Sequence, residues 1–302
     1  MRVFVTGASG FIGSAVVSEL VSAGHDVLGL ARSDASARAV EGAGAQVHRG
    51  DLDNLESLRA GAESADGVIH LAFNHDFTDY AGAAETDRRA IDTLGEVLIG
   101  SDRPFVVTSG LAGFALGRTM TEDDAADPDS PRGSEQAALA FTSRSVRVSV
   151  LRLPPSVHGE GDHGFVPRLI DIARVEGVAA YPGDGFNRWP AVHRFDAARL
   201  FRLALESAPA GAWLHAIGDE GIPVRDIAGA IGRHLGLPVT TISPERPSTT
   251  SAGSAPSSRW TCPPRAPSLA SCWGGGRPTL ASATIWSRVT TSTTAPPDHA
   301  TF

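Results

Sequence analysis

The sequence predicts an α/β fold, a doubly wound parallel Rossmann sheet of about seven strands with a small C-terminal domain. Short β-branched runs alternate with longer amphipathic segments from residue 2 to about residue 150, and parallel strands need crossover connections that are usually helical. A glycine-rich turn joins the first of these runs to the first amphipathic segment. The chain has 302 residues, 42% of them hydrophobic and 20% charged, which suffices for one large domain or two unequal ones.

Five strands are expected in the first half of the chain, each followed by a helical stretch. The first helix extends from the glycine turn to about Ala23, with Gly24 as its C-terminal cap. A long helix is expected from Ala81 to Gly100, and a helix of this length either pairs between subunits, giving a homodimer, or stays solvated. The strands are expected at residues 2–7, 27–32, 45–50, 67–72 and 105–110.

The second half has fewer strands. A sixth strand is expected from Val146 to Leu153, and helices are expected over residues 163–177 and 195–208. In the later helix Ala198, Phe201 and Leu205 recur on one face, which predicts that this face is buried. The remaining elements are a strand at residues 212–218, a helix at residues 224–236 and a strand at residues 238–243.

The composition changes abruptly after about Glu245. Of the 34 acidic residues, 33 lie in positions 1–245, and the remainder is rich in Ser, Thr and Pro. This tail is either a disordered low-complexity segment or the product of a reading-frame slip near Glu245, and its three tryptophans fit the first interpretation poorly. The expected domains are residues 1–155, rejoined by segments around 189–216, then residues 156–245, then an irregular tail at residues 246–302.

Charge and apolar pattern exclude several partners. The net charge of −8 lacks the basic footprint that nucleic acid or an anionic membrane surface requires, so a small molecule is the expected partner. No apolar run approaches the roughly 18–20 residues of a membrane span, and no signal-peptide pattern is present, so a cytoplasmic location is expected. All 26 basic residues are arginine, and therefore no lysine can take part in the chemistry.

Glycines mark the start of the first predicted helix. One glycine permits a tight turn, one lets the backbone approach a pyrophosphate, and one lets helix and strand pack closely, while the helix N-terminus offers N–H groups to phosphate. The sequence therefore predicts a dinucleotide site, and its expected contacts are Gly7, Ser9, Gly10, Phe11, Ile12 and Gly13.

The end of the second strand bears on the choice of cofactor. An NAD-selective site usually places an acidic residue there to bind the ribose 2′-hydroxyl. Arg32 and Ser33 occupy this place, and a guanidinium with a hydroxyl suits a 2′-phosphate. This favours NADP as the cofactor, with NAD as the alternative because Asp34 is the next residue.

Further motifs follow the later strands. They are Gly50-Asp51-Leu52, His70-Leu71-Ala72, Thr108-Ser109-Gly110 and the run Arg152 to Gly159. In these motifs the chain resembles the extended short-chain dehydrogenase/reductase family, also described as the NAD-dependent epimerase/dehydratase family, over roughly residues 1–245. The resemblance implies a C-terminal substrate domain, with adenine beside Asp51 and Leu52, ribose and phosphates beside Leu71 and Ala72, and nicotinamide beside Pro154, Ser156 and Val157.

The catalytic set that the resemblance implies is only partly present. It consists of a serine, matched by Ser109, and a Tyr-x-x-x-Lys dyad on the helix after the fifth strand, in which tyrosine exchanges a proton and lysine lowers the tyrosine pKa. Here Pro131 falls at the tyrosine position and Glu135 at the lysine position, and the only tyrosines are Tyr80 and Tyr181. The dyad is therefore absent.

Three interpretations of function stay open. The first is an oxidoreductase with a substituted proton donor, for which Ser109, His158 and His163 are the candidates near the strand ends. The second is an epimerase or dehydratase acting on a nucleotide sugar, and the third is a non-catalytic sensor that kept the cofactor pocket. Polar groups beyond that pocket favour an enzyme, and substrate contacts are expected at His163, Arg188, Trp189 and His193. No metal is expected, because the histidine spacing fits no zinc pattern.

Overall fold

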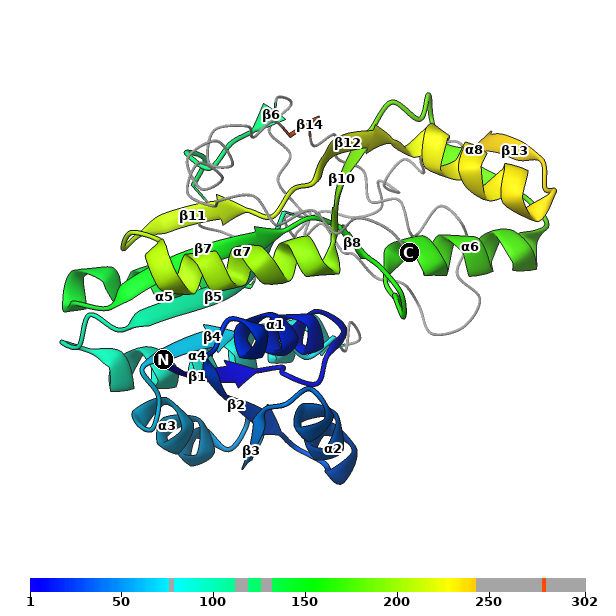
Figure 1. Ribbon diagram of the computed structural model, residues 1–302. Coiled ribbons are helices and arrows are strands. Elements are labelled where there is room, and N and C mark those ends of the chain that lie inside the picture. The colour runs from blue at the N-terminus through cyan, green and yellow to red at the C-terminus, as the bar shows by residue number, and fades with distance from the viewer. Residues whose placement is uncertain (76–78, 112–118, 126–131, 243–278, 281–302) are drawn as a thin grey trace, which may run out of the picture.

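The centre of the molecule is a seven-stranded sheet in which every pairing is parallel, in the order β11-β7-β5-β4-β1-β2-β3 (Figure 1). The computed structural model describes residues 1–75, 79–111, 119–125, 132–242 and 279–280. The predicted Rossmann fold class is confirmed. The strands are β1 (Arg2–Thr6), β2 (Asp26–Ala31), β3 (Gln46–Arg49), β4 (Gly67–His70), β5 (Pro104–Gly110), β7 (Arg147–Leu153) and β11 (Ala212–His215).

Helices cover both faces of this sheet because successive strand residues point to opposite sides. Val3 and Val5 of β1 pack into a core with α1 (Phe11–Ser22) and α7 (Arg194–Ser207), whereas Phe4 packs into a second core with the helices of the other face. The predicted buried face of α7 is confirmed. The other face carries α3 (Leu55–Glu63), α4 (Tyr80–Leu98) and α5 (Ser134–Leu139), while α2 (Asp34–Gly42) follows β2.

The strand order reverses beside β1. The chain first adds β2 and β3 on one side of β1 and then returns to add β4 on the other side. In open α/β sheets, ligands bind in the crevice at the carboxyl ends of strands where the order reverses. This topology places the candidate site at the ends of β1 and β4.

A small lobe adjoins the carboxyl edge of the sheet (Figure 1). Its core packs Leu169, Trp189, Val224 and Ile231 together. The predicted helices and the last strand of this region are confirmed, whereas four strands of three to six residues were not predicted because they are too short to show a period. The elements are β8 (Ser156–His158), α6 (Phe165–Glu176), β9 (Ala179–Pro182), β10 (Arg188–His193), β12 (Asp219–Pro223), α8 (Val224–Leu235) and β13 (Val239–Ile242).

The described residues also form three short elements. β6 (Thr119–Met120) pairs with β14 (Thr279–Leu280), and a 3-10 turn, η2, spans Thr142–Arg144. Apart from β14, the expectations for residues 246–302 lie outside the described residues. Among the helices that are described, none is long and apolar enough to cross a membrane.

Candidate active site

The turn between β1 and α1 approaches the end of β4 more closely than a side chain would allow. Gly7 has a φ of +70°, and a Cβ built on it would lie 2.8 Å from the backbone nitrogen of Ala72. A Cβ on Gly13 would lie 2.0 Å from the carbonyl oxygen of Gly7. Gly10 is the N-cap of α1 and provides no side-chain cap, so the first N–H groups of the helix can bind an anion. The structure therefore brings the predicted glycine loop and Ala72 together as one cradle.

A buried network of hydrogen bonds supports this cradle. Thr6 Oγ1 accepts the N–H groups of Leu71 and Ala72, both at 3.2 Å, so its own hydrogen is directed to His70 Nδ1, 2.8 Å away. Because Nδ1 accepts, the proton of the neutral His70 ring is on Nε2, which donates to Asp87 Oδ1 at 3.1 Å. Asp87 lies on α4 and is fully buried.

Arg132 extends this hydrogen-bond network to the end of β5. Its Nε donates to Ser134 Oγ at 2.8 Å and lies 3.4 Å from Asp87 Oδ2, and a terminal N–H donates to the carbonyl oxygen of Thr108 at 3.2 Å. Burial opposes the charged form of Asp87, but the hydrogen bond from His70 and the charge of Arg132 outweigh it, so the pKa of Asp87 lies below its ordinary value. A buried carboxylate therefore holds the guanidinium at the carboxyl end of β5.

Aromatic and imidazole rings lie beside this guanidinium. The Arg132 guanidinium carbon is 4.2 Å from the ring centroid of Phe73, and that ring meets His75 at 5.4 Å. Burial lowers the pKa of His75, and the charges of Arg132 and His163 lower it further against a backbone hydrogen bond at Phe73. The His163 ring also meets the ring of Phe11 at 5.8 Å. The predicted residue His163 thus lies beside the first residue of α1.

Ser109 stands at the same edge of the sheet. It lies on β5, directly after Thr108, and is 8% exposed. Its neighbour on β7 is Arg152, in parallel register. The hydroxyl of Thr108 is buried and has no hydrogen-bond partner among the described residues. Arg132 therefore contacts the backbone of Thr108, and Ser109 is the next residue of β5.

The predicted residues after β7 form a second group. Pro154 precedes β8, which places Ser156, Val157 and His158 alongside β10. The rings of His158 and His193 meet at 5.4 Å. His193 also caps α7, because its Nδ1 accepts the N–H of Phe195 at 3.3 Å. The two histidines are thus neighbours at the junction of the sheet and the small lobe.

Two predicted substrate contacts are engaged within the small lobe. Trp189 is 5% exposed and packs edge-on against Phe165 with a centroid distance of 5.6 Å. Arg188 donates from a terminal N–H to the carbonyl oxygen of Gly221 at 2.8 Å. Both residues begin β10, whereas His193 ends it. Their role as substrate contacts stays a prediction.

The position expected for the family's lysine holds a buried carboxylate with a partner. Glu135 is 3% exposed and accepts two hydrogen bonds from Arg152, at 2.9 Å and 2.6 Å, and a third from Trp213 Nε1 at 3.0 Å. Arg152 is itself fully buried and also donates to the carbonyl oxygen of Asp124 at 2.8 Å. Glu135 therefore balances a buried charge beneath α5. The tyrosine position, Pro131, lies outside the described residues.

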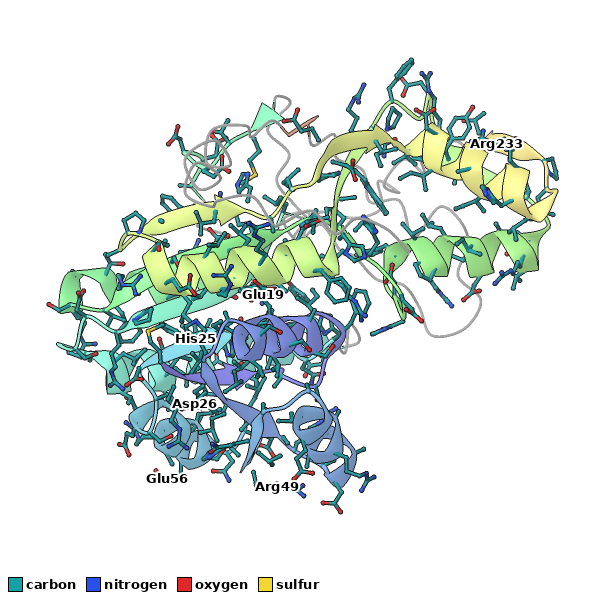
Figure 2. The ribbon with its side chains drawn as sticks, viewed as in Figure 1. Glu19, His25, Asp26, Arg49, Glu56 and Arg233 are labelled. Carbon is teal, nitrogen blue, oxygen red and sulfur yellow. The ribbon has the colours of Figure 1, made fainter. Side chains whose placement is uncertain are left out.

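Two arginines lie near the end of β2, and only one of them has an ion-pair partner among the described residues. Asp34, the residue that left NAD as an alternative, pairs with Arg49 at 2.7 Å, and Figure 2 labels Arg49 at the outer edge of the sheet beside α2. Ser33 caps α2, since its Oγ accepts the N–H of Ser36 at 3.1 Å. Arg32 is exposed, and no described residue forms an ion pair with it.

The other predicted cofactor contacts have local structural roles. Asp51 accepts the N–H groups of Asp53 and Asn54 at 3.0 Å and 2.9 Å, which forms the turn before α3, and Leu52 packs against the second core. Ser9 is exposed in the glycine turn, while Phe11 and Ile12 are half-buried at the start of α1. No group of three His, Cys, Asp or Glu side chains in the described ranges could hold a metal ion.

Several of these residues were not predicted from the sequence. Arg132 lies inside the segment that replaces the dyad, and His75 follows the motif at the end of β4, so a search for basic and imidazole groups beside each motif would have found both. Asp87 carries no such signal. It is one acidic residue in a helix that contains several, and only the packing of α4 shows that it is the buried one.

The fold and the glycine cradle define a Rossmann protein of the short-chain dehydrogenase/reductase type. A family model described as "NAD dependent epimerase/dehydratase family" matches residues 3–101. An uncharacterized protein of Schizosaccharomyces pombe is 50% identical over 248 residues, covering 81% of this chain and 84% of the relative. The chain belongs to the NAD-dependent epimerase/dehydratase family, which confirms the resemblance seen in its motifs.

Relatives with named activities are more distant. The 2′-dehydrokanamycin reductase of Streptomyces kanamyceticus is 31% identical, over 80% of this chain and 69% of the relative. The crystal structure of a dTDP-glucose 4,6-dehydratase from Streptomyces venezuelae with NAD bound superposes with a TM-score of 0.66 at 25% identity, covering 80% of this chain and 84% of that one. An NAD(P) nucleotide is the family's typical cofactor. The glycine loop fits such a nucleotide, because Gly7 and Gly13 lie so close to neighbouring backbone atoms that a side chain could not be accommodated at either position.

Proposed function

We propose that the protein is an NADPH-dependent oxidoreductase that reduces a small carbonyl compound. The observation that carries the proposal is that Arg132, which acts on His75, donates to the carbonyl oxygen of Thr108, the residue before Ser109 near the carboxyl end of β5. The named activity of the similar 2′-dehydrokanamycin reductase supports reduction as the direction. The proposal keeps oxidoreductase chemistry despite the missing Tyr-x-x-x-Lys dyad.

The charges at the end of β2 support NADPH over NADH. A ribose 2′-phosphate needs a cation and hydrogen-bond donors. Arg32 and the hydroxyl of Ser33 supply both, and Asp34 is already paired with Arg49. The one carboxylate that argued for NAD therefore has its charge balanced.

The chain's own residues can manage the charge and the proton. When bound, the nicotinamide supplies a hydride for the carbonyl carbon. The Ser109 hydroxyl can donate a hydrogen bond to the carbonyl oxygen, and the fixed guanidinium of Arg132 favours negative charge near it. His75 donates the proton. Because burial and the Arg132 charge depress the pKa of His75, its imidazolium form is a stronger acid than that of an ordinary histidine and is more populated as the pH falls.

Nucleotide binding is the first test. The full chain is titrated with NADPH and with NADH, following nicotinamide fluorescence, for the unaltered protein and for Gly10→Asp. A carboxylate at the N-terminus of α1 repels the phosphates and is expected to weaken binding at least about a hundredfold. Gly42→Asp adds the same charge at an exposed position of α2 and serves as the control. Failure of the unaltered protein to bind either nucleotide would overturn the proposal.

Turnover is the second test. NADPH oxidation is followed against a panel of aldehydes, ketones and oxo acids, for the unaltered protein and for Ser109→Ala, His75→Asn and His158→Asn. Loss of turnover in the first two variants, with NADPH binding kept, supports the assigned roles. Loss in His158→Asn alone would move proton donation to the second group of residues. Tight binding without turnover on any carbonyl would favour the non-catalytic sensor.

A further inference from the structure

Arg194 lies against the first residue of α1. Its guanidinium carbon is 5.2 Å from the ring centroid of Phe11 and 4.9 Å from that of Phe195. Phe11 directly follows Gly10, the N-cap whose helix end has no side-chain cap. A guanidinium from the second half of the chain therefore lies next to the glycine cradle.

Helix packing brings Arg194 to this place. α7 runs parallel to α1, because Arg202 further along α7 pairs with Glu19 of α1 at 2.7 Å, and Glu206 near the end of α7 pairs with His25, just after α1, at 3.0 Å. Figure 2 labels Glu19 and His25 along this contact. Arg194 is the first residue of α7. Two helix N-termini and one guanidinium consequently meet at the same edge.

Arg194 is electrostatically misplaced in the protein alone. Cations stabilise a helix at its C-terminus and are unfavourable at its N-terminus, where the dipole is positive. Of the carboxylates that the structure describes, none lies within ion-pair distance of Arg194, although Asp196 stands in the same helical turn. The Arg194 Nε is buried and has no hydrogen-bond partner within the described residues. Ring stacking leaves both the charge and this N–H uncompensated.

The loop after β8 leaves room for the side chain of Arg194. Gly159 has a φ of +146°, and a Cβ built on it would lie 3.3 Å from Arg194 Cγ and 3.0 Å from His193 Nε2. A larger residue would press on both side chains. The site thus combines an unpaired cation, a buried unsatisfied donor and space beside a cradle that is built for an anion.

We propose that Arg194 binds the diphosphate of the dinucleotide at the N-terminus of α1. Charge-assisted hydrogen bonds from its guanidinium to phosphate oxygens would satisfy the buried N–H and balance the charge at the helix ends. The inference rests on nucleotide binding at the glycine cradle, as in the proposed function. It does not depend on the substrate, on the direction of the reaction or on the preference for NADPH.

The test uses ADP-ribose, which carries the diphosphate without a nicotinamide. Its affinity for the full chain is measured by calorimetry at several salt concentrations for the unaltered protein, Arg194→Gln and Arg199→Gln. Arg199 is exposed on the same helix and is the matched control. Arg194→Gln is expected to weaken ADP-ribose binding about tenfold and to make it less dependent on salt, because one charged contact is lost. Arg199→Gln is expected to bind as the unaltered protein does.

Arg194→Lys tests whether the positive charge alone supports ADP-ribose binding. It keeps the cation but loses the flat guanidinium, so it is expected to bind between the unaltered protein and Arg194→Gln, with the salt dependence kept. Equal affinity and equal salt dependence in Arg194→Gln and the unaltered protein would overturn the inference and leave the proposed function intact. Absence of ADP-ribose and NADPH binding in the unaltered protein would overturn both.

Discussion

The two ends of the α1–α7 pair carry arginines in opposite electrostatic states. Near the C-terminal ends, Arg202 pairs with Glu19 at 2.7 Å and with Glu206 at 2.9 Å. At the N-terminal ends, Arg194 stacks on Phe11 without a carboxylate partner in the described part of the chain. The first arginine is balanced by the protein itself, and the second is left for an anion to balance. The difference separates a structural arginine from a ligand-binding one on a single helix.

The same contrast recurs elsewhere in the chain. Arg152 is completely enclosed and balanced by Glu135, and Arg49 is paired with Asp34, whereas Arg32, close to Arg49, has no described ion-pair partner. Because every basic side chain that is fully charged at neutral pH is an arginine here, the residue type alone does not indicate the role. Arg32 and Arg194, two arginines without an ion-pair partner among the described residues, lie where nucleotide phosphates are expected.

The largest effect is expected from breaking the most buried arginine–carboxylate pair among the described residues. Glu135→Ala leaves Arg152 as an uncompensated charge in the core and is expected to lower the free energy of unfolding by about 3–5 kcal/mol. Denaturant unfolding of the purified chain measures it. Glu63→Ala, at an exposed position of α3, is expected to change the same quantity by less than about 0.5 kcal/mol. A loss below about 1 kcal/mol for Glu135→Ala would show that the pair contributes little.

An unbalanced arginine should affect binding more than stability. Arg32→Glu is expected to weaken NADPH about tenfold, roughly 1.4 kcal/mol, because the 2′-phosphate meets a carboxylate, while NADH binding changes little. Parallel fluorescence titrations with the two nucleotides measure the effect. Arg38→Glu places the same charge change at an exposed position of α2 and should leave both affinities unaltered. Equal weakening of both nucleotides by Arg32→Glu would argue against NADPH selectivity.

Arg194 and Arg202 of α7 should have opposite effects on binding and stability. Arg202→Gln removes two partly exposed ion pairs and is expected to lower the free energy of unfolding by about 1 kcal/mol without changing ADP-ribose affinity. Arg194→Gln is expected to leave the stability of the nucleotide-free chain unchanged or slightly higher, since a cation leaves a helix N-terminus. Thermal unfolding and calorimetry on both variants test this difference. A matching loss of stability in the two variants would remove the distinction between them.

The smallest effect is expected from a buried histidine next to the Arg152 pair. Burial lowers the pKa of His215 below its ordinary value of 6.5, even though the Glu122 carboxylate opposes this shift. The unfolded chain therefore takes up a proton near pH 6.5 that the folded chain resists, so stability is full above that pH and falls as the pH decreases below it. His215→Gln is expected to flatten this part of the stability profile in denaturant unfolding at a series of pH values. An unchanged profile would contradict the shift.

Much of the fold could be predicted because the apolar pattern of each strand and helix reflects which of its residues are buried. The run containing Val3 and Val5, the glycines that follow it and the spacing of Phe201 and Leu205 all depend on neighbours a few residues away. The short strands β8, β9, β10 and β12 could not be predicted in the same way. Trp189 was predicted as a substrate contact from its motif, and the structure shows that its side chain packs in the core of the small lobe.

By itself, the sequence determined the Rossmann fold class, the glycine loop and the absence of the Tyr-x-x-x-Lys dyad, since each is written in residue identities and short-range spacing. Only the tertiary structure decided which charges are balanced. Glu135 meets Arg152, and Arg194 meets Phe11 instead of a carboxylate. These partners come from separate strands and helices, and a charge interacts with whatever folding brings within a few ångströms of it, which no local pattern records.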